Sequence, residues 1–360
     1  MKPRQAFWKW SLLGGLTACL LIFAQANAVG GFAGLLQVGE VSRLAPLIET
    51  ELGELPLSPN KGHDTQIYYA IGLDLAGDRM PDLFDHGPYR YRRILYPALA
   101  SVFGLLDGYA LLVGMVVLTV ASAAGASGLT AAIARSRGRS DWLALAVLLN
   151  PGVWLAVRLL TADIMALFLM LLGLFWFMRG QKWAPLVFAL SGLTKEIFLV
   201  TPGALAVSGD RSRWKLILIP AAALIAWMMW LTFTMGNGFT GRGNVGLPLV
   251  GMVEASPVWR TFDIADALYL VFALASVGAG LVNSVFNTSW LRWPILTWSV
   301  LGLISSSWVW DIGNNAARVF APIVVLIALA GFRRNAATAE TDSTAAEIKT
   351  SDRGNGSSQA

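Results

Sequence analysis

The sequence has little cysteine, histidine or charge. It contains one cysteine, Cys19, and two histidines, His63 and His86, among 360 residues. A single cysteine excludes an internal disulfide and a cysteine-based zinc site, and two widely separated histidines are a weak zinc signal. Charged residues make up only 14% of the chain, whereas 56% of the residues are hydrophobic. A soluble domain cannot bury so much apolar surface, so the composition predicts a polytopic membrane protein.

Nucleotide-binding signatures and internal repeats are also missing. The chain contains neither GxxxxGK[ST] nor a strand-associated GxGxxG,. An enzyme acting outside the cytoplasm would have no nucleotide sugar or ATP at hand, so any activated donor should be carried by a lipid. The net charge of +5 comes from short basic clusters between apolar runs. We interpret these clusters as topology signals and expect no nucleic-acid partner.

Polar residues are concentrated in one segment, residues 38–96. It holds both histidines, nine of the 22 carboxylates and six of the 27 Lys and Arg residues. Two short motifs lie within it, GHDTQIYY at 62–69 and YRYRRILYP at 89–97. Carboxylate, tyrosine and arginine groups beside a membrane suit an anionic, lipid-linked substrate, with one group for proton transfer and others for phosphate.

Apolar runs separated by basic residues predict about ten membrane-spanning helices. The run at 183–207 is too short for two full spans. It forms either two short helices that meet outside or one span with a buried Lys195-Glu196. The lysine and arginine residues at both of its ends favour the two short helices. The expected spans are 11–32, 109–133, two within 141–179, the short pair at 183–207, 216–235, 265–285, 293–310 and 319–332.

The distribution of charge orients these spans. Fourteen Lys and Arg residues fall on the predicted inner side against two acids, Asp141 and Asp210, and nearly every other acid before the tail falls outside. The positive-inside rule then predicts a multi-pass inner (plasma) membrane protein with both termini cytoplasmic. Residues 1–335 are expected to form the membrane domain, with 38–96 as a long extracytoplasmic loop, and residues 336–360 a disordered cytoplasmic tail.

Processing of the first span is left open by two short patterns. LTAC at 16–19 resembles a lipobox, and ANA at 26–28 resembles a signal-peptidase site,. The residues after Cys19 stay apolar, whereas polar chain usually follows a lipidated cysteine, so an unprocessed first span is the favoured interpretation. Either outcome leaves residues 38–96 outside.

Asp64 is the leading candidate for catalysis. It precedes a helix-compatible segment, TQIYYAIGLDLA. A carboxylate at a helix start near the bilayer can accept a proton from a hydroxyl or hold a metal, because a low dielectric raises its basicity. The alternative is a plain N-cap, with Tyr68 and Tyr69 as interfacial anchors. The local sequence leaves both interpretations open.

Arg90, Arg92 and Arg93 lie on the predicted outer face, where the positive-inside bias disfavours cations,. Guanidinium groups offer planar forks for phosphate, and the alternating tyrosines can stack on a sugar. The alternative is an interfacial helix start whose arginines pair with Asp82 and Asp85 or with lipid headgroups.

Further ionisable residues fall at membrane depth or near the outer face, where they are costly,. Arg158 and Asp163 are five apart, and a structural ion pair between them is the favoured interpretation. For Lys195-Glu196 a functional role is favoured over a structural ion pair. Arg318, in the expected outer turn 311–318, is a further candidate phosphate ligand.

These motifs together resemble the bacterial integral-membrane glycosyltransferases of the GT-C superfamily. The resemblance rests on HDTQIYYAIG, YRYRRILYP, a TAD turn at 161–163, an LTKE turn at 193–196 and the NNAAR turn. It implies an all-α, GT-C-like fold and transfer of a hexosyl group from a polyprenyl-phosphate donor. It also implies that Asp64 is the base or a metal ligand, and that arginines or Lys195 hold the donor phosphate. The chain departs from the family pattern in lacking an adjacent acidic pair in the first loop and a large soluble C-terminal domain.

We therefore expect a cell-envelope glycosyltransferase acting on an extracytoplasmic glycan, lipid or protein. Asp64 would be the general base; the expected phosphate ligands are Arg90, Arg92, Arg93, Lys195 and Arg318, and the expected substrate-binding residues are His63, Tyr68, Tyr69, Asp163 and Glu196. No cofactor is assigned, and a divalent metal ion at Asp64 stays open. The alternative functions are a transporter or flippase for a lipid-linked or anionic precursor, which would have two similar halves around a midplane cavity, and a structural subunit of an envelope-assembly complex.

Overall fold

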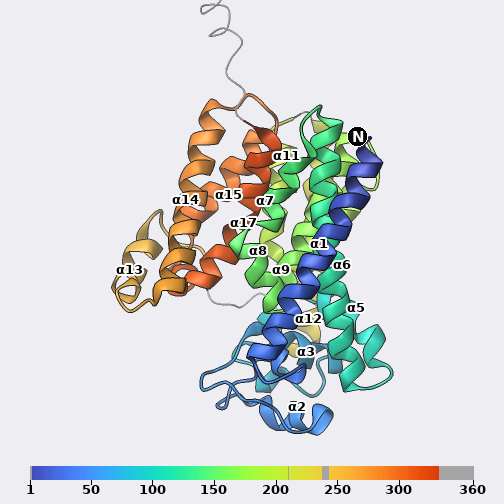
Figure 1. Ribbon diagram of the computed structural model, residues 1–360, viewed down its shortest axis with the longest axis vertical. Coiled ribbons are helices and arrows are strands. Elements are labelled where there is room, and N and C mark those ends of the chain that lie inside the picture. Colours follow the sequence, from blue (N-terminus) through green and yellow to red (C-terminus); the bar gives the residue numbers. More distant parts are fainter. Residues whose placement is uncertain (1, 210, 237–242, 332–360) are drawn as a thin grey trace, which may run out of the picture.

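Helices form nearly all the regular structure of the protein. The computed structural model describes residues 2–209, 211–236 and 243–331 (Figure 1). In these residues the only pairing of extended backbone is three isolated β-bridges. The longer helices are α1 (Pro3–Ala28), α3 (Asp64–Leu73), α5 (Leu95–Gly104), α6 (Gly108–Ser136), α9 (Ala162–Met178), α10 (Ala184–Thr194), α12 (Lys215–Met235), α13 (Val250–Trp259), α14 (Ile264–Phe286), α15 (Arg292–Ile304) and α17 (Gly313–Ala330).

Shorter helices connect them. The α-helices of eight residues or fewer are α2 (Ala45–Leu52), α4 (Gly87–Tyr91), α7 (Leu145–Leu148), α8 (Pro151–Arg158), α11 (Val200–Val207) and α16 (Ser307–Trp310). The 3₁₀ helices are η1 (Ala33–Leu36), η2 (Pro81–Leu83), η3 (Asp141–Ala144), η4 (Glu196–Leu199) and η5 (Arg211–Trp214). The expected all-α class is confirmed. The expected tail at 336–360 lies outside the described residues.

Five helices, α1, α6, α12, α14 and α17, are long and apolar enough to cross a bilayer. A sixth crossing results if the segments Asp141–Leu148 and Pro151–Arg158, which are bent by 58° at their junction, count as one span. The protein is therefore a multi-pass membrane protein. The prediction of about ten spans is wrong, because several apolar runs are broken into helices too short to cross.

The breaks have local causes. Pro151 begins α8, and the Asn150 side chain accepts hydrogen bonds from the backbone N–H groups of Gly152 and Val153, so a new helix starts inside the apolar run,. At 17 residues, α9 is about 25 Å long, less than the roughly 30 Å of a hydrocarbon core. Lys195 has an extended backbone, with φ −157° and ψ 116°, and ends α10 after 11 residues.

The segment 183–207 forms two short helices, α10 and α11, as predicted, and the two make a hairpin. Helix α10 runs antiparallel to α9, since the Ser191 hydroxyl donates to the carbonyl of Ala166 and Phe188 lies against Gly173. Helix α11 runs parallel to α9, since Lys195 contacts Asp163 and Thr201 contacts Met170. Lys195 and Glu196 are therefore at the apex of the hairpin.

Two ends of the bundle can be distinguished. At one, which we call the terminal end, the Trp10 indole N–H donates to Asp141, and Arg139 donates to the carbonyls of Ala328 and Leu329. At the other, the loop end, the segment from Gly30 to Arg93 packs across the helices, with α2 and α3 at the bottom of Figure 1.

Helix α1 packs along α6 because small residues line the contact,. A Cβ atom added to Gly14 would lie 2.5 Å from the Ser127 hydroxyl, and one added to Gly128 would lie 2.8 Å from the carbonyl oxygen of Phe7. Side chains larger than hydrogen at these two positions would push the helices apart.

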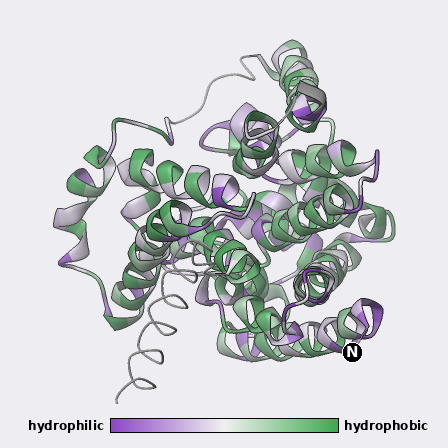
Figure 2. Cartoon of the chain, turned by 90° about the horizontal axis from the view of Figure 1, so that it is seen from above, coloured by the Kyte–Doolittle hydropathy of each residue, from purple (hydrophilic) through white to green (hydrophobic). Residues whose placement is uncertain are grey.

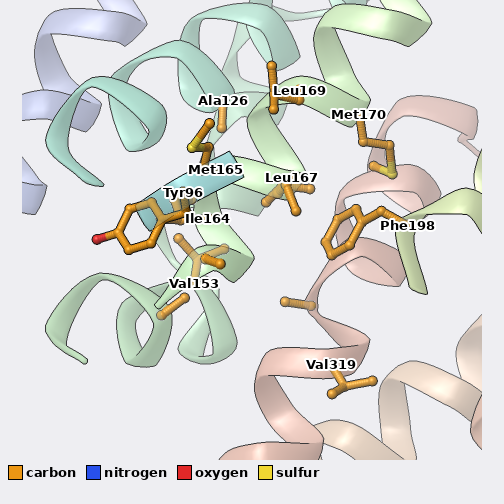
Figure 3. Packing of buried hydrophobic residues seen from close by; sticks show 14 of the residues in the cluster. Tyr96, Ala126, Val153, Ile164, Met165, Leu167, Leu169, Met170, Phe198 and Val319 are labelled. Carbon is orange, nitrogen blue, oxygen red and sulfur yellow. The ribbon is translucent and has the colours of Figure 1, made fainter. Parts of the chain in front are cut away.

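Most of the core is one large cluster of buried hydrophobic residues, and a small second cluster contains Trp10. Buried residues from separate segments, including Val153 of α8, Leu167 of α9, Phe198 of η4 and Val319 of α17, gather in one cluster (Figure 3). Seen along the bundle, most helical turns are hydrophobic, and hydrophilic residues are more frequent in the connections (Figure 2). Large apolar side chains on α12 and α14 are exposed, such as Phe233 at 83%, which fits contact with lipid.

Candidate functional site

Eight charged side chains converge at the loop end, and we call them the charged cluster. They are Asp64 of α3, Asp85, Arg90 of α4, Arg93, Asp163 of α9, Lys195, Glu196 of η4 and Arg318 of α17. Except for Asp85, all were predicted from the sequence as site residues. Five separate segments of the chain contribute to the charged cluster.

Helix α3 presents Asp64 at its first turn. The helix begins at Asp64, and His63 is the N-cap residue with extended backbone, so the interpretation of Asp64 as the N-cap is wrong. Gly62, just before His63, has φ +74°, and a Cβ atom on Gly62 would lie 2.5 Å from the Gln37 carbonyl oxygen. The turn that leads into α3 therefore needs glycine at this position. The Thr65 hydroxyl donates to the carbonyl of Leu159 and fixes the start of α3 against the turn between α8 and α9.

Arg90 bridges two carboxylates. Its Nη1 donates to Asp64 Oδ1 over 2.9 Å, while its Nε and Nη2 donate to the two oxygens of Asp85 over 2.9 and 3.0 Å. The alternative interpretation, in which the arginines of this motif pair with Asp82 and Asp85 or with lipid headgroups, is met in part by the pair of Arg90 with Asp85. Burial favours the neutral carboxyl of Asp64, but Arg90, Arg318, Arg93 and Lys195 outweigh this effect and lower its pKa to about 2,.

Arg93 joins α4 to the apex of the hairpin. Its Nε and Nη2 donate to the two oxygens of Glu196 over 3.1 and 3.0 Å. Its Nη2 also donates to the Tyr89 hydroxyl over 3.0 Å, and that hydroxyl accepts a second hydrogen bond of 2.8 Å from the Asn244 amide. The two hydrogen bonds to Glu196 fix the plane of the Arg93 guanidinium group.

The deepest part of the cluster is a triad. Asp163 contacts Lys195 through one oxygen, and its other oxygen lies 3.7 Å from Nη1 of Arg318. All three side chains are between 6% and 8% exposed. The predicted pair between Arg158 and Asp163 is wrong, because Arg158 instead donates to the Gln25 side chain over 2.9 Å. The predicted turn at 311–318 is also wrong, since α17 begins at Gly313 and carries Arg318 in its second turn.

A cavity of about 10 Å³ borders the triad, enough for about one water molecule. Asp163, Arg318, Phe198 and Pro322 are among its lining residues. The buried Nε of Arg318 has no hydrogen-bond partner among the described residues. A sugar or phosphate would therefore have to approach from the more exposed side of the cluster, where Asp64 and Asp85 are 29% and 39% exposed.

The other predicted site residues differ in position. Tyr68 is buried, interacts with Arg93 and packs edge-on against Tyr96. His63 adjoins Asp64, and burial together with Arg318 lowers its pKa. Arg92 lies over the Tyr89 ring.

Tyr69 is the exception among the predicted substrate-binding residues. It is fully buried, and its hydroxyl lies beside Gly108, at the start of α6. There Glu51 and Asp107 reinforce the effect of burial in raising its pKa. Its side chain therefore does not join the charged cluster.

Besides Asp85, two residues of the site were not predicted as site residues. The Tyr89 ring lies 5.4 to 5.8 Å from the guanidinium carbons of Arg90, Arg92 and Arg93, and its position in the YRYRR motif was the available signal. Asn244 reaches Tyr89 across 155 positions of sequence, and no local pattern indicates that contact.

A divalent metal ion does not fit the carboxylates of the cluster. Across the described ranges, no group of three or more His, Cys, Asp or Glu side chains could hold a metal ion. Asp64, Asp163 and Glu196 instead each face a cation, which would repel a metal ion. No catalytic step is therefore assigned to a metal.

Comparison of the chain with family models, with curated proteins and with solved structures finds no match.

Proposed function

We propose that the charged cluster is the catalytic site of a glycosyltransferase that moves a sugar from a polyprenyl-phosphate donor to an extracytoplasmic acceptor. One observation carries the proposal: the predicted base, Asp64, lies 2.9 Å from Arg90 in a cluster that also holds Arg93, Lys195 and Arg318. A carboxylate and several cations at one end of a membrane bundle supply the two functions that transfer from a lipid phosphate needs.

The reaction has a simple balance. The bond between the anomeric carbon of the sugar and the donor phosphate oxygen breaks, and its electron pair leaves with the phosphate. The acceptor oxygen forms the new glycosidic bond, and its proton passes to the Asp64 carboxylate. Guanidinium groups stabilise the negative charge that develops on the leaving phosphate, since their planar donors match phosphate oxygens.

The orientation of the bundle supports an external site. The terminal end and the connections between helices at that end carry several cations, namely Lys9, Arg135, Arg137, Arg139 and Arg179. The positive-inside rule assigns that end to the cytoplasm. The loop end would then face outside the inner membrane, where the donor has to be a lipid-linked sugar.

Replacing Asp64 with Asn tests the proposal. We expect Asp64→Asn to lower transfer from a radiolabelled polyprenyl-phosphate hexose to endogenous acceptors by about 100-fold or more, because general-base catalysis contributes on that scale. Membranes containing equal amounts of the wild type and of the variant are compared in the same assay. The matched control is Asp82→Asn, which removes one exposed carboxylate from the same loop and should keep wild-type transfer. Transfer near the wild-type rate by Asp64→Asn would remove the assignment.

A further inference from the structure

The cations of the charged cluster are already neutralised by carboxylates. Arg90 pairs with Asp64 and Asp85, and Arg93 pairs with Glu196. Lys195 and Arg318 share Asp163. Four cations thus face four carboxylates. On the exposed side of the cluster, displacing a carboxylate is the way for an anionic ligand to gain a cation partner, because a second anion added beside an existing pair would be repelled by the carboxylate.

The pair between Arg90 and Asp64 is the easiest to open. Asp64 is held to Arg90 by one hydrogen bond, whereas Glu196 is held to Arg93 by two. The Asp64 side chain is 29% exposed, whereas Asp163 is 6% exposed and faces two cations. Among the carboxylates on the more exposed side of the cluster, Asp64 is therefore the one that an incoming anion can displace by breaking the fewest hydrogen bonds.

Asp85 would keep Arg90 in position during such an exchange. Its two oxygens accept hydrogen bonds from Nε and Nη2 of Arg90, so the guanidinium group stays oriented when Nη1 loses Asp64. The Tyr89 ring, 5.8 Å from the guanidinium carbon, supports it from another side. The Nη1 group of Arg90, which donates to Asp64 in the structure, would then donate to the ligand.

We propose that the phosphate group of the donor displaces Asp64 from Arg90, so that donor binding frees the Asp64 carboxylate to act on the acceptor. The inference rests on the proposed function and adds an order to it, with the donor binding before the acceptor. While Asp64 is paired, its low pKa makes it a weak base. Once Arg90 is taken by phosphate, the main cause of that low pKa is removed and the basicity of Asp64 increases.

Binding of farnesyl monophosphate tests the exchange without any catalytic step. The full chain is placed in phosphatidylcholine nanodiscs, and the dissociation constant is measured for the wild type and for Asp64→Asn. The variant removes the competing carboxylate, so we expect it to bind about threefold to tenfold more tightly than the wild type. Asp64→Ser serves the same test if the Asn variant is not recovered as folded protein. The inference thus predicts that a change which stops transfer strengthens donor binding.

Two variants separate this exchange from general electrostatics. Asp82→Asn changes the net charge of the same loop by the same amount and should bind like the wild type. Glu196→Gln removes the carboxylate partner of Arg93 and should gain less than Asp64→Asn. Farnesol, which lacks the phosphate, should bind the wild type and Asp64→Asn equally. A gain with farnesol, an equal gain in Asp82→Asn, or a larger gain in Glu196→Gln would overturn the inference.

The failure of this inference can be distinguished from failure of the proposed function. If the wild type transfers sugar and binds farnesyl monophosphate as tightly as Asp64→Asn does, only the exchange is wrong. If the wild type does not bind farnesyl monophosphate, the phosphate site itself is wrong, and the proposed function fails together with the exchange.

Discussion

At the scale of single residues, burial separates the charged side chains into two groups. Asp163, Lys195 and Arg318 are nearly enclosed, and each of the two cations depends on the one carboxylate between them. Arg90, Asp64 and Asp85 are between 20% and 39% exposed, and water screens their interactions. Loss of one partner therefore has very different consequences for folding in the two groups, because an uncompensated buried charge is costly and an exposed one is not.

Asp163→Asn tests the role of the buried triad in stability. The change leaves Lys195 and Arg318 without their counter-charge, and we expect it to cost about 3 to 5 kcal/mol. The midpoint of thermal unfolding in detergent micelles measures the effect. The matched control is Asp141→Asn, whose carboxylate pairs with the 38% exposed Lys9 and accepts from Trp10, and which should cost about 1 kcal/mol. Equal decreases in the unfolding midpoint for the two variants would show that the buried triad contributes no special stability.

At the scale of helices, small residues and helix breaks position the site. The contact of α1 with α6 depends on Gly14 and Gly128, and α6 in turn packs against α9, which carries Asp163. The breaks at Asn150 and Lys195 turn apolar runs into short helices whose ends meet at the loop end. A continuous helix through Lys195 would move Glu196 away from Arg93.

Gly14→Ala tests the close contact of α1 and α6. The added methyl group would lie 2.5 Å from the Ser127 hydroxyl and 2.9 Å from the Ala123 carbonyl oxygen, and we expect a loss of about 1 to 3 kcal/mol. Gly15→Ala, on the next position of the same helix, would meet only Ala124 Cβ at 3.6 Å and should be neutral or slightly stabilising. Thermal unfolding midpoints of the two variants are compared. The packing argument would be wrong if Gly15→Ala were the more destabilised.

At the scale of the whole molecule, aromatic and basic side chains mark the terminal end. Lys9 lies 4.9 Å from the ring centres of Trp10 and Trp142, and Arg137 lies 5.6 Å from that of Trp290. Tryptophan is typical of both membrane interfaces, and an excess of lysine and arginine is typical of the cytoplasmic one. The proposed site is at the opposite end of the bundle.

Single cysteines test this orientation. In a Cys19→Ser background, which removes the exposed native thiol, we expect Glu54→Cys at the loop end to react with a membrane-impermeant maleimide in intact cells. Gln181→Cys, in the connection between α9 and α10, should react only after the membrane is permeabilised. Both positions are exposed, so exposure alone does not separate them. The reverse pattern of labelling would contradict an external site.

The number of spans shows where the sequence misleads. Hydropathy predicts α6, α12 and α14 within about three residues, because a long apolar run without breaks has one stable form in a bilayer. It also predicts α1, but α1 begins at Pro3, ahead of the expected start at residue 11. Hydropathy overcounts at 141–179 and 183–207, where Asn150, Leu160 with its φ of +43°, and Lys195 interrupt the helices, and at 293–310, where α15 ends at Ile304. These interruptions are stabilised by tertiary contacts, such as the Asn150 amide donating to the carbonyl of Ala321.

The sequence by itself determined the helical membrane class and the concentration of polar residues in 38–96, since hydropathy and residue type are local properties. Only the tertiary structure decided the partner of each charge. Asp64 and Arg90 are 26 positions apart, and Arg93 and Glu196 are 103 apart. Arg158 donates to Gln25 and does not pair with Asp163, which is only five positions away in the sequence. Ion pairs form between groups that helix packing brings within a few ångströms, and distance along the chain does not report that packing.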